Sequence, residues 1–101
     1  MTDPKSTTEP RIVRRCLVSG RVQGVYYRAS AADRARAAGI TGHALNLPDG
    51  RVEVLACGSE PAVEEFIAWL WIGPSAAKVS AVAAEVLELA AHELPVRFRT
   101  G

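Results

Sequence analysis

Apolar and polar residues alternate with the two-residue period of a β-strand in several short segments of the chain. In one of them Val52, Val54 and Ala56 would share one face, and the residues between them the opposite face. The segment 85–91 is also rich in Ala, Glu and Leu and is therefore open to either strand or helix. A short alternating segment near the end of the chain is expected at a sheet edge. The pattern predicts strands at residues 11–19, 40–47, 51–57, within 78–89, and at 95–100.

A first helix is predicted at residues 27–38, an Ala- and Arg-rich run with high helix propensity. Ala31, Ala35 and Ala38 would form a narrow apolar stripe along it. Their small side chains would let the helix lie close to a sheet. Gly39 can end this helix, because glycine readily adopts the left-handed conformation that is common just after a helix C-terminus.

A second helix is predicted after Gly58, where apolar residues recur at the spacing i, i+3, i+4 and i+7. Ser59 can cap the N-terminus of this helix, and Pro61 fits in its first turn. The dipeptide Gly73-Pro74 marks its end. The stripe that is expected to face the core consists of Val63, Phe66, Ile67 and Leu70.

Turn-forming residues at 47–50, Leu-Pro-Asp-Gly, predict a hairpin between the second and third strands. The order of elements is then β-α-β-β-α-β with an additional short fifth strand at an edge. This order is typical of an α+β fold of the ferredoxin-like class, a split βαβ sandwich. We therefore expect two helices on one face of a mainly antiparallel sheet, in one domain over residues 11–101.

Composition indicates a globular domain that follows a short tail. The 101 residues are 49% hydrophobic and 23% charged, which is ordinary for this class. Residues 1–10 are polar, contain two prolines and lack periodicity, so we expect a disordered tail. The chain has neither the apolar stretch of a signal peptide nor a run approaching the ~20 apolar residues of a membrane span. These features predict a cytoplasmic protein with no membrane partner, in which Cys16 and Cys57 are free thiols on opposite sheet faces.

The segment from Gly20 to Arg28 joins the first predicted strand to the first helix and is the strongest candidate for a functional site. Glycine permits positive φ, and a loop that leads into a helix N-terminus presents backbone N–H groups to an anion. Arg28 can bind two phosphate oxygens with its planar guanidinium. The net charge is +1, but residues 1–50 carry eight Lys and Arg against four Asp and Glu, which suits a small anionic ligand. These features alone leave both a phosphate-binding loop and a simple tight turn open.

Three ordered motifs make the interpretation more specific. The sequence reads G-x-V-Q-G-V-x-Y-R at residues 20–28, G-x-A-x-N at 42–46 followed by D-G-R-V at 49–52, and G-P-x-A-A-K-V at 73–79. Together these motifs resemble the signatures of the acylphosphatase family and span nearly all of the chain after residue 10. The resemblance implies the ferredoxin-like fold and the hydrolysis of acyl phosphates to carboxylate and orthophosphate. It implies no metal or other cofactor.

The resemblance also assigns roles to individual residues. It implies that Arg28 binds the phosphoryl group and that Asn46 orients the attacking water. Asn46 cannot act as a base at neutral pH, so the proton would pass to an oxygen of the substrate's own phosphate. Position alone would instead favour Asn46 as a turn residue before the hairpin. The substrate-binding amides are expected in the loop formed by Gly20, Arg21, Val22, Gln23, Gly24 and Val25.

Departures from the family pattern occur at His43, Leu45 and Ser75. We expect them to change packing more than chemistry, because Arg28 and Asn46 are intact. Two other functions stay open: a catalytically weak module of the same fold that binds only an anion or a protein, and an RNA-recognition domain, which shares the topology.

No nucleic-acid partner is expected, because the third predicted strand, residues 51–57, lacks the aromatics on which RNA-recognition domains stack bases. Nothing in the sequence requires more than a monomer that acts on a small-molecule acyl phosphate. Trp69 and Trp71 leave two interpretations open, an exposed patch for self-association or partial burial against the next loop.

The two histidines are expected to be structural or solvated. His43 lies three residues from Asn46, so a regular strand would place the two side chains on opposite faces. His92 has no predicted partner.

Overall fold

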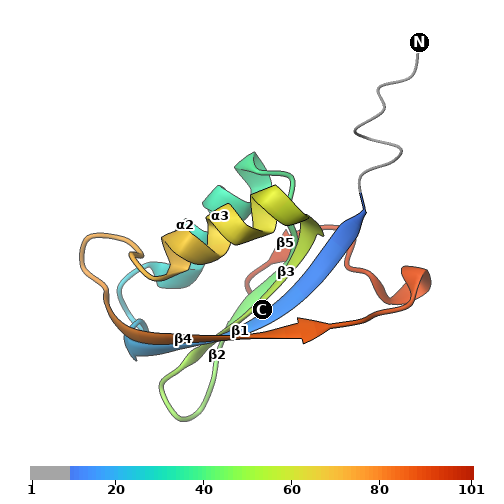
Figure 1. Cartoon of the computed structure of the whole chain (residues 1–101). Coiled ribbons are helices and arrows are strands. Elements are labelled where there is room, and N and C mark those ends of the chain that lie inside the picture. Colours follow the sequence, from blue (N-terminus) through green and yellow to red (C-terminus); the bar gives the residue numbers. More distant parts are fainter. Residues whose placement is uncertain (1–9) are drawn as a thin grey trace.

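Two helices lie on one face of a five-stranded sheet in a computed structural model of the chain, which describes residues 10–101 (Figure 1). The tail predicted at residues 1–10 lies, up to residue 9, outside the described residues. The elements follow the predicted order, with one short 3₁₀ helix before the last strand. Their bounds are β1 Arg11–Arg21, α2 Tyr27–Ala37, β2 Thr41–Asn46, β3 Val52–Ser59, α3 Glu60–Leu70, β4 Lys78–Leu87, η1 Ala91–Glu93 and β5 Phe98–Arg99.

The strands are ordered β4-β1-β3-β2-β5 across the sheet. β1 pairs antiparallel with β3 and β4, and β2 pairs antiparallel with β3. β5 is short and pairs in parallel with β2 at one edge. The predicted α+β ferredoxin-like fold, with a mainly antiparallel sheet and a short fifth edge strand, is therefore confirmed. No helix within residues 10–101 is long and apolar enough to cross a membrane.

Several element boundaries differ from the prediction. β1 continues beyond its predicted end at Ser19, because a bulge between Ser19 and Gly20 lets it stay paired with β4. Segment 85–91, for which the sequence left strand and helix open, is strand as far as Leu87, and the 3₁₀ helix η1 begins at Ala91. The last strand has two residues, fewer than the predicted range 95–100.

The core lies between the sheet and the two helices. Alternation along β1 and β3 buries the residues expected from their periodicity. Of the predicted stripe of α3, Val63, Phe66 and Leu70 are buried and Ile67 is partly buried. In α2, Ala31 and Ala35 are buried as predicted, but Ala38 is exposed because it caps the C-terminus, and Ala32 joins the core instead. The core cluster includes Cys16, Val18, Val52, Val54, Ala56, Val63, Phe66 and Leu70.

Trp69 is partly buried between the two helices. Its ring centroid lies 5.9 Å from that of Tyr27 and 6.3 Å from that of Phe66. The guanidinium carbon of Arg34 lies 5.4 Å from the centroid of the same ring. Trp71 is 51% exposed. The two tryptophans therefore do not form one exposed pair, and of the two interpretations that the sequence left open, partial burial holds for Trp69.

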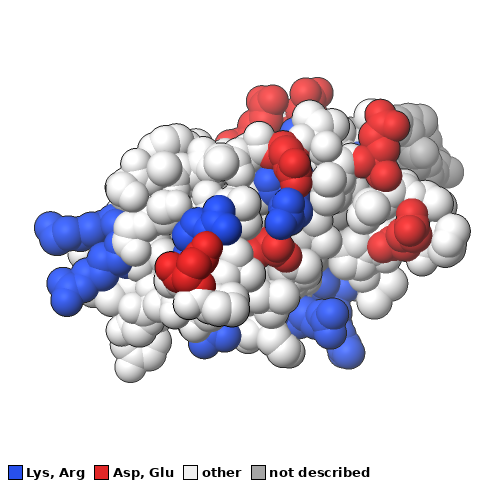
Figure 2. Space-filling model, turned by 90° about the horizontal axis from the view of Figure 1, so that it is seen from below, with Lys and Arg blue, Asp and Glu red and all other residues white. Residues whose placement is uncertain are grey.

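The sheet face opposite the helices carries a network of charged side chains. Glu53 accepts from Nε of Arg15 at 3.1 Å and lies 2.8 Å from Nε2 of His43, while Nη1 of Arg15 bonds Glu85 at 2.6 Å. Burial tends to raise the pKa of Glu53, but the hydrogen bonds from His43 and Arg15 outweigh it and hold this pKa below its usual value. Figure 2 shows acidic and basic side chains interspersed over this face. His43 thus has a structural partner, as expected.

The two cysteines are free thiols, as predicted, and both are buried. Cys16 belongs to the core beneath the helices, and Cys57 is not part of that cluster. Burial raises the pKa of Cys16 to about 11. This thiol is therefore protonated at neutral pH and poorly nucleophilic.

Candidate active site

The loop between β1 and α2, residues 22–26, has a backbone conformation suited to binding an anion. φ is 76° at Gly24 and 62° at Tyr26, while Val22, Gln23 and Val25 have no positive φ. Such alternation turns successive N–H groups towards one side and forms a concave anion site. Within the described residues, the amides of residues 22–25 donate to no backbone carbonyl. α2 begins directly after Tyr26 without a side-chain cap, so its first amides also lack intrahelical partners.

Arg28 lies in the first turn of α2, directly after this loop. Its Nη1 donates to the carbonyl oxygen of Thr100 at 3.1 Å, which holds the guanidinium in place. None of the ion pairs within residues 10–101 includes Arg28, so no carboxylate offsets its charge. Arginine has five N–H donors in a planar fork. The donors that Thr100 does not use can bind two oxygens of one phosphoryl group.

Asn46 is the last residue of β2, and its side chain is exposed. It shares a strand face with Ala44, which is buried in the core beneath the helices. Its carboxamide can accept a hydrogen bond from a water through Oδ1 and donate one through Nδ2. The side chain can therefore orient a water without removing its proton. His43, which bonds Glu53, lies on the other face.

A cavity of about 350 Å³ brings the candidate groups together. Arg28 and Asn46 both line it, with Val22 and Gly24 of the loop. The other residues predicted for the substrate site do not line it; these are Gly20, Arg21, Gln23 and Val25. The remaining lining residues are Tyr26, Tyr27, Ala29 and Thr100.

Gln23 connects the loop to the β2–β3 hairpin instead of lining the cavity. Its Nε2 donates to the carbonyl oxygens of Leu47 and Arg51, both at 2.9 Å. The predicted turn lies between these two residues, closed by the amide of Leu47, which donates to Arg51 at 2.8 Å. Asn46 directly precedes Leu47. Gln23 therefore fixes the loop relative to the strand that carries Asn46.

The two glycines of the loop motif have different physical roles. At Gly20, where φ is 119°, a Cβ would lie 2.2 Å from the carbonyl oxygen of Lys78 and 2.7 Å from the amide of Ser80. Only glycine fits there, because β1 bulges closely against β4. At Gly24 a Cβ would meet nothing within 4 Å, so this glycine serves the backbone conformation alone.

Sequence reasoning missed two contacts that organise the site. Thr100 holds Arg28 across a sequence separation of 72 residues, and no local pattern marks a backbone carbonyl as an acceptor. Tyr27 stands inside the motif, but its role depends on a distant partner: its buried hydroxyl donates to the carbonyl of Leu70 at 2.6 Å. Burial raises the pKa of Tyr27, so this hydroxyl stays a donor.

Basic side chains project near the end of the molecule where β1 ends and β4 begins. Figure 2 shows them protruding at its left edge, the end at which Figure 1 places these strand termini. Arg21 and Lys78 are exposed and opposite one another in the pairing of β1 with β4. The loop follows Arg21 directly, so a positive potential lies close to the candidate anion site.

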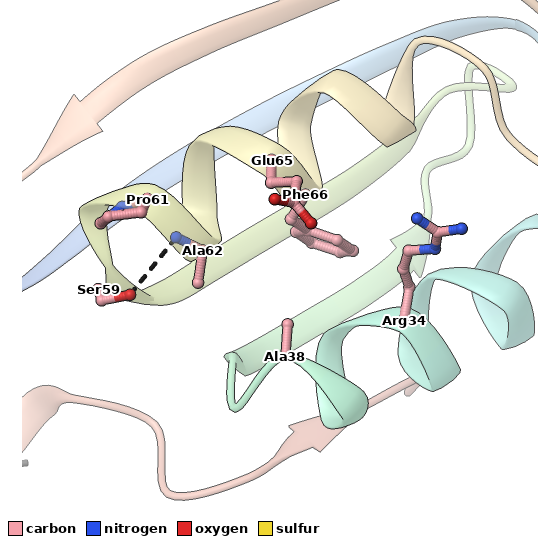
Figure 3. Close-up of a pocket in the computed structure, with 7 residues that line it drawn as sticks. All are labelled: Arg34, Ala38, Ser59, Pro61, Ala62, Glu65 and Phe66. Carbon is pink, nitrogen blue, oxygen red and sulfur yellow. Dashed lines mark hydrogen bonds between the residues drawn. The ribbon is translucent and has the colours of Figure 1, made fainter.

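A second cavity, of about 420 Å³, lies between the two helices (Figure 3). Arg34 of α2 and Glu65 of α3 lie on its two sides. The amide of Ala62 donates a hydrogen bond to Oγ of Ser59 at 3.4 Å. None of the residues predicted for the site lines this cavity. Within residues 10–101, no three or more His, Cys, Asp or Glu side chains gather into a potential metal site.

Comparison with known proteins identifies the family. The sequence matches the model of the Acylphosphatase family over residues 14–100. It is 56% identical over 77 residues to an acylphosphatase of Chromohalobacter salexigens, covering 73% of this chain and 86% of that protein. It is 51% identical over 87 residues to an acylphosphatase of Halorhodospira halophila, covering 86% and 91%. The fold matches the structure of an acylphosphatase from Coxiella burnetii with a TM-score of 0.86 and 35% identity, over 94% of this chain and 99% of that one. The chain belongs to the acylphosphatase family, whose activity is the hydrolysis of acyl phosphates.

Proposed function

We propose that this chain hydrolyses acyl phosphates with its own loop 20–25, Arg28 and Asn46. Loop amides and Arg28 bind the phosphoryl group, and Asn46 orients the attacking water. One observation carries the proposal: Asn46 of β2 lines the same cavity as Gly24 and Arg28, which belong to the loop and the first turn of α2.

The phosphoryl group is bound by donors that the fold leaves available. The amides of residues 22–25 have no backbone acceptor among the described residues, and Arg28 has no carboxylate partner there. Negative charge is spread over the non-bridging oxygens in the transition state of phosphoryl transfer. Donors that already point to these oxygens lower the barrier, because they need no reorganisation.

The water attacks phosphorus opposite the bond to the acyl oxygen. A new bond forms between the water oxygen and phosphorus, and the bond from phosphorus to the acyl oxygen breaks, so the carboxylate leaves with the electron pair. Oδ1 of Asn46 accepts one O–H of the water and directs a lone pair at phosphorus. The proton that the water loses passes to a phosphoryl oxygen, since the carboxamide does not accept it. The products are carboxylate and orthophosphate.

The test is release of orthophosphate from benzoyl phosphate by the unaltered chain, by Arg28→Gln and by Asn46→Ala. We expect Arg28→Gln to lower kcat/KM by about 10²- to 10³-fold, the cost of losing one preorganised donor group. Asn46→Ala should lower kcat while the inhibition constant of inorganic phosphate changes little, because Asn46 acts on the water and not on the phosphoryl group.

Arg36→Gln is the matched control. Arg36 belongs to the same helix and donates to a carbonyl of β5, that of Phe98 at 3.0 Å, but it does not line the cavity. Its variant should keep full activity. Equal rates for the unaltered chain and Arg28→Gln would remove Arg28 from the mechanism. The monomeric state and the cytoplasmic location predicted from the sequence stay predictions.

A further inference from the structure

Tyr26 lines the same cavity as Arg28 and Asn46, yet its side chain is 83% exposed. It immediately precedes α2 and is separated from Arg28 by one residue. An aromatic ring therefore stands at the open side of the cavity, within reach of whatever projects from a bound phosphoryl group.

The backbone at Tyr26 makes this choice of residue unusual. Its φ of 62° and ψ of 22° place it in the left-handed region, and it is the one non-glycine residue with positive φ among the described residues. Glycine and asparagine adopt this conformation readily, while a bulky side chain there is strained. The other residue with positive φ in loop 22–26 is a glycine, Gly24. The concave shape of the loop thus requires this backbone conformation at position 26, but it does not require a tyrosine there.

The fold does not use the ring either. The aromatic contacts within residues 10–101 join Tyr27, Trp69, Phe66 and Phe98, and none includes Tyr26. Its hydroxyl has no hydrogen-bond partner among the same residues, whereas that of neighbouring Tyr27 is bonded to Leu70. A strained, largely exposed tyrosine with no aromatic contact and no hydrogen bond of its hydroxyl within residues 10–101 adds little stability, so its role is to be sought in the ligand.

We propose that Tyr26 contacts the acyl group of the substrate and favours acyl phosphates whose acyl group is aromatic. This inference rests on the proposed function. The loop amides and Arg28 hold the phosphoryl end, so the acyl group must extend through the open side of the cavity. A flat apolar group there can stack on the phenol ring, and a small one such as acetyl has too little surface to do so.

The test compares kcat/KM for benzoyl phosphate and acetyl phosphate in the unaltered chain and three variants at Tyr26. Tyr26→Gly and Tyr26→Asn remove the ring with residues that tolerate positive φ, so both should fold. Tyr26→Phe keeps the ring. We expect the ratio of the two kcat/KM values, benzoyl over acetyl, to fall by about three- to tenfold in the glycine and asparagine variants. The phenylalanine variant should keep the ratio.

Trp71→Ala is the control for loss of an exposed aromatic away from the cavity, and it should leave the ratio unchanged. Active variants at Tyr26 with an unchanged ratio would overturn the inference and leave the proposed function standing. An equal fall in Tyr26→Phe would also overturn it, since the ring would then not be the cause. If the unaltered chain hydrolysed neither substrate, the proposed function would fail, and this inference with it.

Discussion

Replacing Gln23 with methionine removes two hydrogen bonds and no other interaction of comparable strength. Both bonds, to the carbonyls of Leu47 and Arg51, measure 2.9 Å. Each such bond contributes about 0.5–1.5 kcal/mol net. Neither carbonyl would be left unpaired, because Leu47 also accepts from Gly50 at 3.1 Å and Arg51 from the amide of Leu47 at 2.8 Å. The loss of unfolding free energy should therefore stay near the lower end, about 1–2 kcal/mol in total.

The same substitution should also slow catalysis. Gln23 is the side chain that joins loop 22–26 to the turn of the hairpin, and Asn46 directly precedes that turn. A displacement of about 1 Å in a positioning group can cost about 10²-fold in rate. We expect kcat for benzoyl phosphate to fall by about tenfold, because the turn keeps its own hydrogen bonds and limits the movement. The inhibition constant of inorganic phosphate should stay within about twofold, since the loop amides and Arg28 are still present.

The assay combines orthophosphate release, competitive inhibition by inorganic phosphate and urea unfolding of the same samples. Ile67→Val is the matched control. Ile67 is a partly buried residue of α3, and its shortening should lower the unfolding free energy by about 0.5–1.5 kcal/mol without lowering kcat. A Gln23→Met variant with normal kcat would refute the positioning role. A raised inhibition constant at normal kcat would assign Gln23 to phosphate binding instead.

Four further substitutions test the energetics of the fold. Gly20→Ala should lower the unfolding free energy measured in urea by about 3 kcal/mol or more, because its Cβ would overlap a backbone carbonyl at 2.2 Å. The Cβ of Gly24→Ala meets no atom within 4 Å, so this variant should lose only about 1 kcal/mol, through its positive φ. Equal losses in the two variants would contradict this reasoning. Tyr27→Phe should lower the unfolding free energy by about 1–2 kcal/mol, since the buried carbonyl of Leu70 loses its donor, and a neutral result would mean that the bond adds nothing. Glu53→Gln should destabilise the chain at pH 7 by about 1 kcal/mol. Because the pKa of Glu53 is lowered in the folded chain, its stabilisation is present above the unfolded pKa and is lost as pH falls through the folded pKa. The unfolding free energies of the unaltered chain and of Glu53→Gln should therefore begin to converge as pH falls below the unfolded value of about 4.3, and a constant difference would show that the ionised carboxylate is not its source.

The strands and helices could be predicted because burial imposes a period on the sequence. Alternation placed Val52 and Val54 on the buried face of β3, and the helical spacing placed Phe66 in the core. Ends of elements were less predictable, since they depend on pairing with other strands. β1 passes Ser19 because β4 can follow it through a bulge, and this is not visible in the sequence of β1 alone.

The motifs made the prediction of the candidate site specific, whereas the properties of single residues left a phosphate-binding loop and a simple tight turn both open. The position of Arg28 after a glycine loop already suggested a phosphate site, the family resemblance made that role specific and assigned Asn46, and the fold brings both to one cavity. The role of Gln23 was not predictable, because its partners are backbone carbonyls of a hairpin 24 and 28 residues away. The same holds for Thr100, whose contribution is also a carbonyl and is independent of its side chain.

A loop with unpaired amides and two left-handed residues is locally unfavourable, so contacts outside it must maintain its shape. Three side chains make such contacts through long-range hydrogen bonds, and each side chain fixes a different part. Gln23 attaches the loop to the hairpin, the hydroxyl of Tyr27 attaches the start of α2 to the carbonyl at the end of α3, and Arg28 is held by the carbonyl of Thr100. In each of the three the acceptor is a backbone carbonyl, which substitution of its own residue does not remove. The preorganisation that phosphoryl transfer requires therefore depends on these donors rather than on the glycines of the loop, which only permit its conformation.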